Sequence, residues 1–534
     1  MAWREASWIA GPVRCSAAPP PTGPPWFPAD AARPSQRGVP SGRNVPAQGR
    51  ARVNKGLLRR KTIEAQPAGQ QLARTLGWPH LVALGVGAIV GTGILTLIGV
   101  GADRAGPAVL LSFVVAGAIC VCAALCYAEM ATSIPASGSA YTYSYAVLGE
   151  VIAWVVGWSL ILEYSLVVAT VAVGWSGYAT GFLKGMGIVL PDALTHGPVL
   201  AGRACTGAVR EAAFGINLPA VFIIAVVAGL LSLGTRESAR INSALVVLKI
   251  VTLVLFVAVA LPHFDAANLH PFAPFGYGSG NLHCDPNSGA VVKSGVMAAA
   301  AIIFFAFYGF DAISTAAEEV KRPERDLAIG IVGSMVACTV IYMVVAAAAI
   351  GALHFSRFSN STEPLALILR EIGQGSVATI VAAAAAIALP TVILGFLYGQ
   401  SRIFLVMARD GFLPPALTRL SKRGTPARIT AVTAVLVSVL AAVTPLDVIA
   451  SLANAGTLCA FVAVAACVLV SRRREPGAHR PFRTPLAWLV APLAIVGCLY
   501  LFTSLQAVTQ IAFFAWNAIG LAVYFLYARG RARV

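Results

Sequence analysis

The chain has 534 residues, of which 58% are hydrophobic and only 11% are charged, and its mean hydropathy is +0.78. Soluble globular proteins carry about 25% charged residues, so this composition excludes that class and indicates a polytopic membrane protein. The formal net charge is +17, but the basic residues lie in tails and in loops between apolar segments. This distribution fits anionic lipid and the positive-inside rule, and it does not favour nucleic-acid binding.

Residues 1–71 are rich in proline, alanine, glycine and arginine and show no apolar periodicity. Such a composition cannot bury enough apolar surface to compensate for the entropy of ordering the chain. We therefore expect a disordered, basic cytoplasmic tail. The basic run from Lys55 to Lys61 lies at the end of this tail that approaches the membrane.

Twelve apolar segments follow, each near the ~20 residues that a helix needs to cross a bilayer. We place them at about 80–101, 108–131, 148–182, 218–234, 241–262, 294–317, 328–352, 376–400, 429–444, 447–471, 486–504 and 507–528. Most of the 39 Lys and Arg residues fall in the N-terminal tail and in the loops on the same side, and only seven fall in the opposite loops. The positive-inside rule then predicts that both termini are cytoplasmic, with 529–534 as a short basic cytoplasmic tail.

The first apolar segment contains four glycines within nine residues, in the run Gly85-Val-Gly-Ala-Ile-Val-Gly-Thr-Gly93. Each glycine costs a helix about 1 kcal/mol relative to alanine, and a backbone that leaves the helix inside lipid needs new hydrogen-bond partners. Such a break presents N–H groups that suit a carboxylate and carbonyl groups that suit an ammonium. An α-amino acid carries both groups. The alternative interpretation is close packing of small residues between helices.

Lys249, in the fifth segment, is the one basic residue that we place inside an apolar segment. It lies about eight residues into the segment, which at ~1.5 Å per residue is some 10–12 Å deep. An ionisable residue at such a depth is a functional hypothesis by default, and burial disfavours its charged form. We therefore predict that Lys249 couples transport to proton movement. The alternative is a lysine that extends its side chain to the cytoplasmic interface.

The sixth segment offers a second candidate break at Gly309, which lies next to aromatic residues and to Asp311. The first and sixth segments each begin a block of five segments. Interrupted helices at corresponding positions of two halves indicate an inverted-repeat transporter with its site at mid-membrane. Considered alone, the sixth segment also fits aromatic packing around a flexible glycine.

Two acidic residues lie within apolar segments, Glu163 in the third and Asp311 in the sixth. They could line a water path, contact a cationic side chain of a ligand, or form structural hydrogen bonds with neighbouring helices. These alternatives stay open from the sequence.

The ten cysteines show no metal-ligand spacing, and the chain has no Walker-type phosphate loop and no haem-attachment motif. We therefore expect no enzyme activity, no cofactor and no metal site. Cys205 and Cys284 fall in two loops on the predicted outer side, and a disulfide between them is an open alternative.

Several longer stretches together resemble the amino acid–polyamine–organocation superfamily, in particular its cationic amino acid transporter branch and the bacterial relatives of that branch. The likeness covers roughly 72–528 and leaves only the N-terminal tail outside. The matching stretches are GVGAIVGTGI at 85–94, YAEMATSIPASGSAYTYSYAVLGE at 127–150, GWSLILEY at 157–164, GFDAISTAAEEVKRPERDLAIGI at 309–331, RIFLVMARDGFLPP at 402–415 and NAGTLCAFVAVAACVLVSRRR at 454–474.

The resemblance implies an all-α integral membrane protein with a LeuT-like fold of twelve transmembrane helices. Two inverted five-helix repeats would occupy 72–262 and 294–471, and two further helices would lie within 486–528. The residues implied to hold the amine and carboxylate of a substrate through the unwound backbone are Ile89, Gly91, Thr92 and Gly93. Those implied to line the site from the sixth helix are Phe305, Ala306, Tyr308 and Gly309.

Three further positions match functional residues of the family. Lys249 matches the lysine of the fifth helix that bacterial relatives use in proton coupling, and Glu163 and Asp311 match acids near the substrate pocket. Relatives often have a smaller aliphatic residue at the position of Tyr308, so a bulkier pocket wall could exclude long substrates.

We therefore predict a secondary active amino acid transporter of the cell membrane, which takes up its substrate together with protons by alternating access. Its partners would be an amino acid, the proton and the lipid bilayer, and no nucleic acid. An exchanger or uniporter for cationic amino acids or polyamines remains the alternative. A non-transporting amino acid sensor is the alternative from another class.

Overall fold

A computed structural model of the chain describes residues 59–61, 76–136, 138–198, 202–203, 205, 209–210, 214–233, 238–284, 291–359, 361–414 and 427–531. All of these residues belong to one compact unit, Lys55–Val534. The predicted disordered tail over 1–71 lies outside the described residues apart from 59–61, and so does the end of the C-terminal tail.

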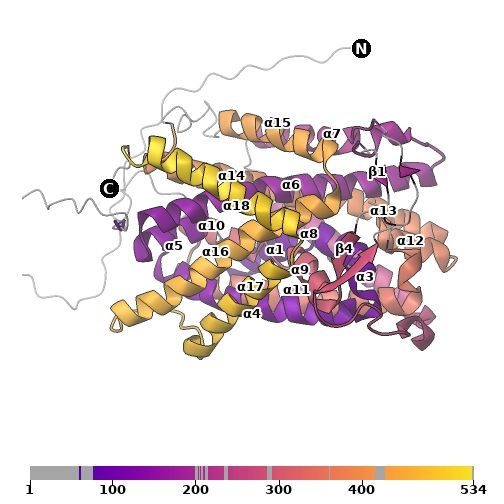
Figure 1. Cartoon of the computed structure of the whole chain (residues 1–534), viewed down its shortest axis with the longest axis horizontal. Helices are drawn as coiled ribbons and strands as arrows, with labels where there is room; N and C mark the ends of the chain where they lie inside the picture. Colours follow the sequence, from indigo (N-terminus) through magenta and orange to yellow (C-terminus); the bar gives the residue numbers. More distant parts are fainter. Residues whose placement is uncertain are drawn as a thin grey trace, which may run out of the picture. The chain divides into compact units, whose positions relative to one another are not determined.

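The described chain is almost entirely helical, with long helices that run side by side (Figure 1). The helices are α1 (Trp78–Ile89), α2 (Thr92–Leu95), α3 (Leu97–Ala105), α4 (Val109–Ser133), α5 (Ser139–Val147), α6 (Glu150–Gly185), α7 (Leu218–Leu233), α8 (Ser238–Ala260), α9 (Val296–Ile303), α10 (Phe310–Thr315), α11 (Pro323–Ala352), α12 (Pro364–Glu371), α13 (Gly375–Ala388), α14 (Pro390–Arg409), α15 (Ala427–Val443), α16 (Leu446–Arg474), α17 (Ala487–Ser504) and α18 (Ala507–Val523). A π-helical turn over Tyr524–Ala528 continues α18.

Two short antiparallel hairpins lie in the connections between helices. Strand β1 (Gly202–Arg203) pairs with β2 (Val209–Arg210) between α6 and α7, and β3 (Asn281–Cys284) pairs with β4 (Val291–Ser294) between α8 and α9. A disulfide joins Cys205 to Cys284, with their Cα atoms 5.7 Å apart. The disulfide that the sequence left open is therefore present.

Within the described chain, ten helical stretches are long and apolar enough to cross a membrane, and two further apolar helices, Leu218–Ser232 and Ala427–Val443, are shorter. Each of these coincides with one of the predicted apolar segments, so the count of twelve spanning helices stays a prediction for the two short ones. Short helices α5 and α12 were not predicted. The eighth predicted segment consists of two helices that meet at Pro390, because proline lacks the N–H that a continuous helix needs.

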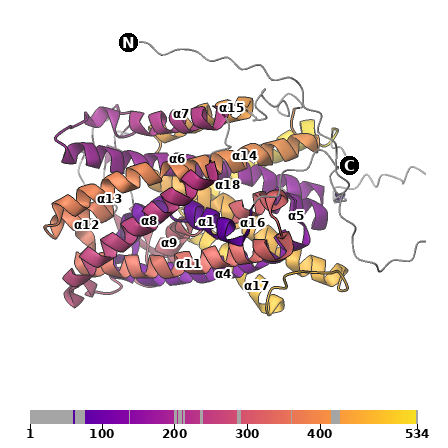
Figure 2. The same cartoon turned by 180° about the vertical axis from the view of Figure 1, so that it is seen from behind.

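The burial of the helices separates the centre of the protein from its lipid-facing edge. Of the apolar window of Val296–Thr315, 89% is buried inside the protein, against 28% for Ala507–Ala528. The broken stretch formed by α9 and α10 is thus the most enclosed part of the fold. Helices α8 and α11 lie against α1 (Figure 2), and α6 packs along both α14 and α16.

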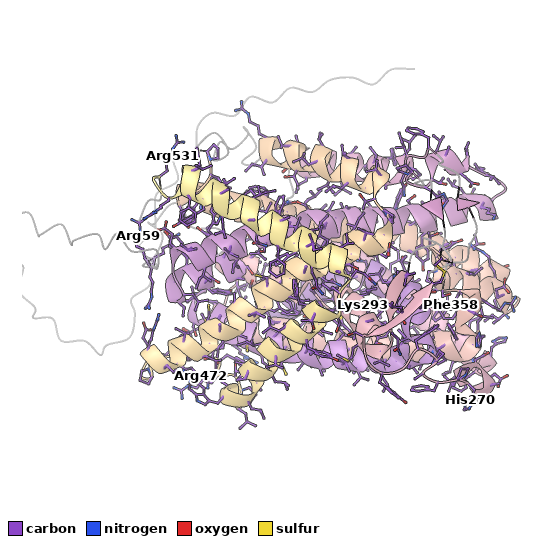
Figure 3. All side chains as sticks on the ribbon, viewed as in Figure 1. Arg59, His270, Lys293, Phe358, Arg472 and Arg531 are labelled. Carbon is purple, nitrogen blue, oxygen red and sulfur yellow. A yellow bond between two sulfur atoms is a disulfide. The ribbon has the colours of Figure 1, made fainter. Side chains whose placement is uncertain are left out.

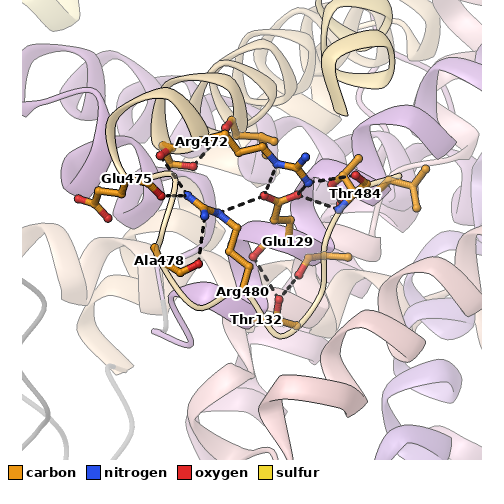
Figure 4. A network of polar contacts seen from close by, with 11 residues as sticks. Glu129, Thr132, Arg472, Glu475, Ala478, Arg480 and Thr484 are labelled. Atoms are coloured by element: carbon orange, nitrogen blue, oxygen red, sulfur yellow. Dashed lines mark hydrogen bonds and ion pairs between the residues drawn. The ribbon is translucent and has the colours of Figure 1, made fainter. Parts of the chain in front are cut away.

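An ionic network joins two distant segments at one end of the helices (Figure 4). The buried Glu129 carboxylate, in the last two turns of α4, accepts hydrogen bonds from Arg472 at 2.6 and 2.9 Å and from the Thr484 N–H at 2.8 Å. Arg480 completes the cluster, with its Nε 3.5 Å from the same carboxylate. Charge-assisted bonds of this kind are about twice as strong as neutral ones, so the network anchors the α16–α17 connection to α4.

Candidate functional site

Helix α1 is interrupted after Ile89, in the middle of the glycine-rich run. Val90 has an extended conformation, with φ −71° and ψ 97°, and Gly91 has φ −148° and ψ −147°. The helix resumes at Thr92. The predicted break is therefore present, and it leaves carbonyl groups at the end of α1 and N–H groups at the start of α2 without partners in their own helix.

The second predicted break lies between α9 and α10. Helix α9 tightens into a 3₁₀ turn over Phe304–Ala306, and Gly309 has φ +121°, a conformation that residues with a Cβ rarely adopt. The chain becomes helical again at Phe310. A glycine at position 309 therefore lets the backbone turn sharply inside the most buried part of the fold.

The two breaks touch each other through their backbones. A Cβ added to Gly93 would lie 2.3 Å from the Ala306 Cα, and one added to Gly309 would lie 2.9 Å from the Ala88 carbonyl carbon. Real carbon contacts are about 3.5–4.0 Å. Glycine is thus required at both positions for the broken helices to cross this closely.

Side chains from neighbouring helices satisfy several carbonyl groups at the breaks. Lys249 Nζ on α8 donates to the Gly87 carbonyl at 2.8 Å, and the Tyr342 hydroxyl on α11 donates to the Ile89 carbonyl at 2.7 Å. The Asn454 amide on α16 donates to the last carbonyls of α9, at 2.7 and 3.2 Å. These bonds replace the helical hydrogen bonds that the breaks remove, as an apolar environment requires.

A cavity lies between the two breaks and two uninterrupted helices. The residues that line it are Ala88, Ile89, Gly91, Thr92, Gly93, Val167, Val171, Phe305, Tyr308, Val392 and Phe396. Six of the eight predicted substrate-binding residues are in this set. Ala306 and Gly309 are not, because they form the contacts between the breaks behind the cavity.

The sequence reasoning missed the wall opposite the breaks. Val167 and Val171 on α6, and Val392 and Phe396 on α14, lie four residues apart in each helix and so share one face. This spacing was visible in the sequence, but valines at helical spacing also face lipid. Only the packing of α6 against α14 identifies them as walls of a cavity.

Two polar groups of the cavity lining lack a partner within the described chain. These are the Thr92 hydroxyl on α2 and the Tyr308 hydroxyl between the turn and α10. An unpaired buried hydroxyl costs about 1–3 kcal/mol. Both groups can therefore donate to a polar ligand, or accept from one, with a gain in free energy.

The structure places Lys249 inside the protein, with only 3% of its surface exposed. Its Nζ contacts the Gly87 carbonyl on α1 and does not extend to the interface. A second small cavity beside it is lined by Val90, Leu95 and Thr252 among others. No carboxylate of the described chain forms an ion pair with Lys249, so its ammonium would be uncompensated by a counter-charge.

The two predicted pocket acids lie close to the cavity but do not line it. Asp311 accepts hydrogen bonds from the Tyr164 hydroxyl at 2.9 Å and from the Gly309 N–H at 3.1 Å, which joins α6 to the second break. Glu163 is completely buried, and neither of its oxygens has a hydrogen-bond partner in the described chain. Glu163 lies one helical turn before Val167 of the cavity wall.

In the part of the chain that the structure describes, no group of three or more His, Cys, Asp or Glu side chains could hold a metal ion. The site can therefore be analysed in terms of backbone polarity, two free hydroxyls and an apolar wall. Its chemistry is recognition of a small zwitterion, with a polar end at the breaks and an apolar end at α6 and α14.

Comparisons with known proteins agree with this arrangement. A family model described as amino acid permease matches residues 76–528. The chain is 43% identical to the branched-chain amino acid permease BcaP of Bacillus subtilis (strain 168) over 483 residues, which cover 90% of this chain and 99% of the relative. It is 39% identical to the methylthioribose transporter of the same organism, over 89% of this chain and 98% of the relative. It is also 33% identical to the vacuolar cationic amino acid transporter 2 of Arabidopsis thaliana, over 79% of this chain and 64% of the relative.

Proposed function

Because the chain belongs to the amino acid permease family, we propose that it takes up neutral aliphatic α-amino acids together with protons by alternating access. It is an amino acid transporter and not an enzyme. The observation that carries the substrate proposal is the cavity between the two breaks, with its polar backbone at one end and its apolar wall at the other.

The polar end suits the two charged groups that every α-amino acid shares. The N–H groups at Thr92 and Gly93 begin α2 and favour a carboxylate, and the carbonyls at the end of α1 favour an ammonium. The free hydroxyls of Thr92 and Tyr308 add two hydrogen bonds. Ala306 and Gly309 would act by holding the second break in place.

The apolar wall supports a branched or straight aliphatic side chain. The ends of Val167, Val171 and Val392 offer no hydrogen bond, and Phe396 adds an aromatic ring. A guanidinium or ammonium placed there would be buried without a partner, which costs several kcal/mol. The printed name of the first relative, a branched-chain amino acid permease, fits this proposal.

A cationic substrate is the second candidate, and the unpartnered Glu163 favours it. Its carboxyl group lies one turn along α6 from the cavity wall, and a long cationic side chain that displaced this wall would find a counter-charge there. The names of the plant relatives fit this candidate.

Lys249 would supply proton coupling. Its bond to the Gly87 carbonyl links the fifth apolar segment to the first break, so gain or loss of its proton changes the contacts of the substrate-binding helix. A ligand shifts the balance between inward-facing and outward-facing states only by binding one of them more tightly. A lysine that is charged in one state and neutral in the other provides such a difference.

The proposed topology places both termini in the cytoplasm and the Cys205–Cys284 disulfide outside, where oxidising conditions let disulfides persist. In Figure 3, Arg59, Arg472 and Arg531 lie toward one end of the helices and Lys293 toward the other. We further propose two inverted five-helix repeats over 72–262 and 294–471, with two additional helices within 486–528.

The test is uptake of radiolabelled valine, alanine and arginine into proteoliposomes, with and without an inward proton gradient. We expect the gradient to stimulate uptake of valine and alanine, and arginine to be excluded. Arginine uptake that ignores the gradient would overturn the proposal in favour of a cationic carrier. Binding of valine without flux would indicate a sensor.

The variant Lys249→Ala tests the coupling role. We expect valine binding to persist and stimulation by the proton gradient to be lost, whereas Lys184→Ala, which removes an exposed lysine at the end of α6, should leave the stimulation intact. Gradient-stimulated uptake in the Lys249 variant would contradict the role of this residue.

A further inference from the structure

The β3–β4 hairpin is built onto the outer ends of both broken helices. Strand β4 runs directly into α9, and the Gly295 N–H between them donates to the Arg104 carbonyl of α3 at 2.7 Å. The segment that leads to β3 also contacts α3, since the Ala108 N–H donates to the Phe272 carbonyl at 2.8 Å. The hairpin therefore moves with the outer halves of the helices that form the cavity.

The disulfide connects this hairpin to the opposite wall of the cavity. Cys284 is the last residue of β3, and its partner Cys205 lies in the connection that follows α6. Helix α6 carries the wall residues Val167 and Val171. The hairpin is thus joined covalently to one wall and through the backbone to the other, as a lid hinged across the mouth would be.

A set of charged side chains forms a second connection at the same place. His283 Nε2 lies 3.7 Å from one oxygen of Asp103, and Arg104 Nε lies 3.7 Å from the other oxygen. Arg104 is 2% exposed, and its Nη2 lies 3.5 Å from Asp447 in the first turn of α16. The hairpin, the outer end of α3 and the start of α16 are therefore held together by charge.

Resting on the proposed function and topology, we infer that His283 is an external proton-sensitive latch: its protonation strengthens the ion pair with Asp103 and favours the closed outer mouth. A neutral imidazole and a carboxylate 3.7 Å apart attract weakly, whereas an imidazolium and a carboxylate form an ion pair. The latch joins the hairpin to α3, so it resists separation of the outer half-helices from the lid.

The other charged groups around His283 set the size of the effect. Asp103 favours the protonated imidazole, and Arg104, which shares the same carboxylate, opposes it. Lys293 on β4 is directed away, since its Nζ donates to the Thr503 and Leu505 carbonyls at 2.8 Å. A ring of Phe275, 4.5 Å from the imidazole centroid, covers one side.

The pair is partly exposed, with 26% of the His283 side chain and 10% of the Asp103 side chain accessible. Ion pairs of this exposure shift an equilibrium by a factor of about two to five. The latch would therefore tune the balance between open and closed mouths and would not be required for transport. An acidic exterior would favour closure over a substrate that has already bound.

The experiment measures access to the cavity from outside and needs no transport. A cysteine introduced as Val171→Cys in the cavity wall is labelled in proteoliposomes with a membrane-impermeant maleimide at pH 5.5 and 7.5, and rates are normalised to those of glutathione at each pH. In this background we expect normalised labelling to be about two- to five-fold slower at pH 5.5. Labelling of the parent chain without this cysteine supplies the blank.

Two histidine variants decide the result. His283→Gln should abolish the protection at acidic pH, and His270→Gln, an exposed histidine of the same outer segment, should retain it. Asp103→Asn should also abolish it. Protection that persists in His283→Gln would overturn the inference.

The same measurement in Lys249→Ala separates this inference from the proposed function. If proton-driven uptake is lost and His283-dependent protection remains, the two protons act at different sites and the latch stands. If uptake never responds to protons but protection does, the proposed coupling fails and the latch is unaffected.

Discussion

A single methyl group at Gly93 should disable the site while leaving the fold intact. In Gly93→Ala the new Cβ would lie 2.3 Å from the Ala306 Cα and 2.5 Å from its Cβ. Carbon atoms pack at about 3.5–4.0 Å, so the two breaks must separate by roughly 1 Å. The obstacle is backbone, which cannot rotate away as a flexible side chain does.

Forced separation of well-packed groups costs about 1–3 kcal/mol. If this cost falls on the state that closes around the substrate, affinity drops by a factor of roughly 5 to 150, because each 1.4 kcal/mol is tenfold. Equilibrium binding of valine in detergent, together with initial uptake rates in proteoliposomes, measures this loss. The thermal unfolding midpoint reports separately whether the variant is folded.

The matched control is Gly395→Ala on α14, where no atom of the described chain lies within 4 Å of the new Cβ. It makes the same chemical change in a helix that carries cavity residues, and we expect binding and uptake to be unchanged. Wild-type affinity in Gly93→Ala would refute the argument that the crossing of the two breaks shapes the site.

Three further changes test other parts of the structure. Glu129→Gln removes a buried charge from its two arginine partners, so the thermal unfolding midpoint should fall, by an amount equivalent to about 3 kcal/mol; an unchanged midpoint would contradict the anchoring role. Arg59→Ala with Lys61→Ala breaks ion pairs to two buried carboxylates and should lower the midpoint, whereas Arg60→Ala, whose side chain is exposed, should leave it unchanged. Deletion of residues 1–52 should leave uptake rates intact, and lost activity would refute the prediction of a dispensable tail.

The features that were predictable from the sequence are those in which one stretch of chain determines its own structure. Glycines in an apolar segment indicate a helix break wherever they lie, and both breaks occur at the predicted places, near Gly91 and Gly309. Segment length and hydropathy likewise located the long helices to within a few residues. The buried position of Lys249 followed from its depth along the chain.

The remaining features depend on distances between segments that sequence spacing does not contain. The partner of Glu129 lies 343 residues away, and the hydroxyl that binds Asp311 comes from Tyr164 on another helix. Val392 resembled any lipid-facing valine until α14 was seen to pack against α6. The hairpins escaped prediction because strands of two to four residues carry too little periodicity to recognise.

The bonds that Lys249 and Tyr342 make to the Gly87 and Ile89 carbonyls have a consequence for the return half of a transport cycle. A carrier that has released its cargo must turn back, and bare carbonyls at the centre of a membrane would each cost several kcal/mol on the way. Here the protein brings its own donors to two of these groups. Such a carrier can reset without a counter-substrate, so it is suited to accumulate its cargo against a gradient and is not bound to trade one molecule for another.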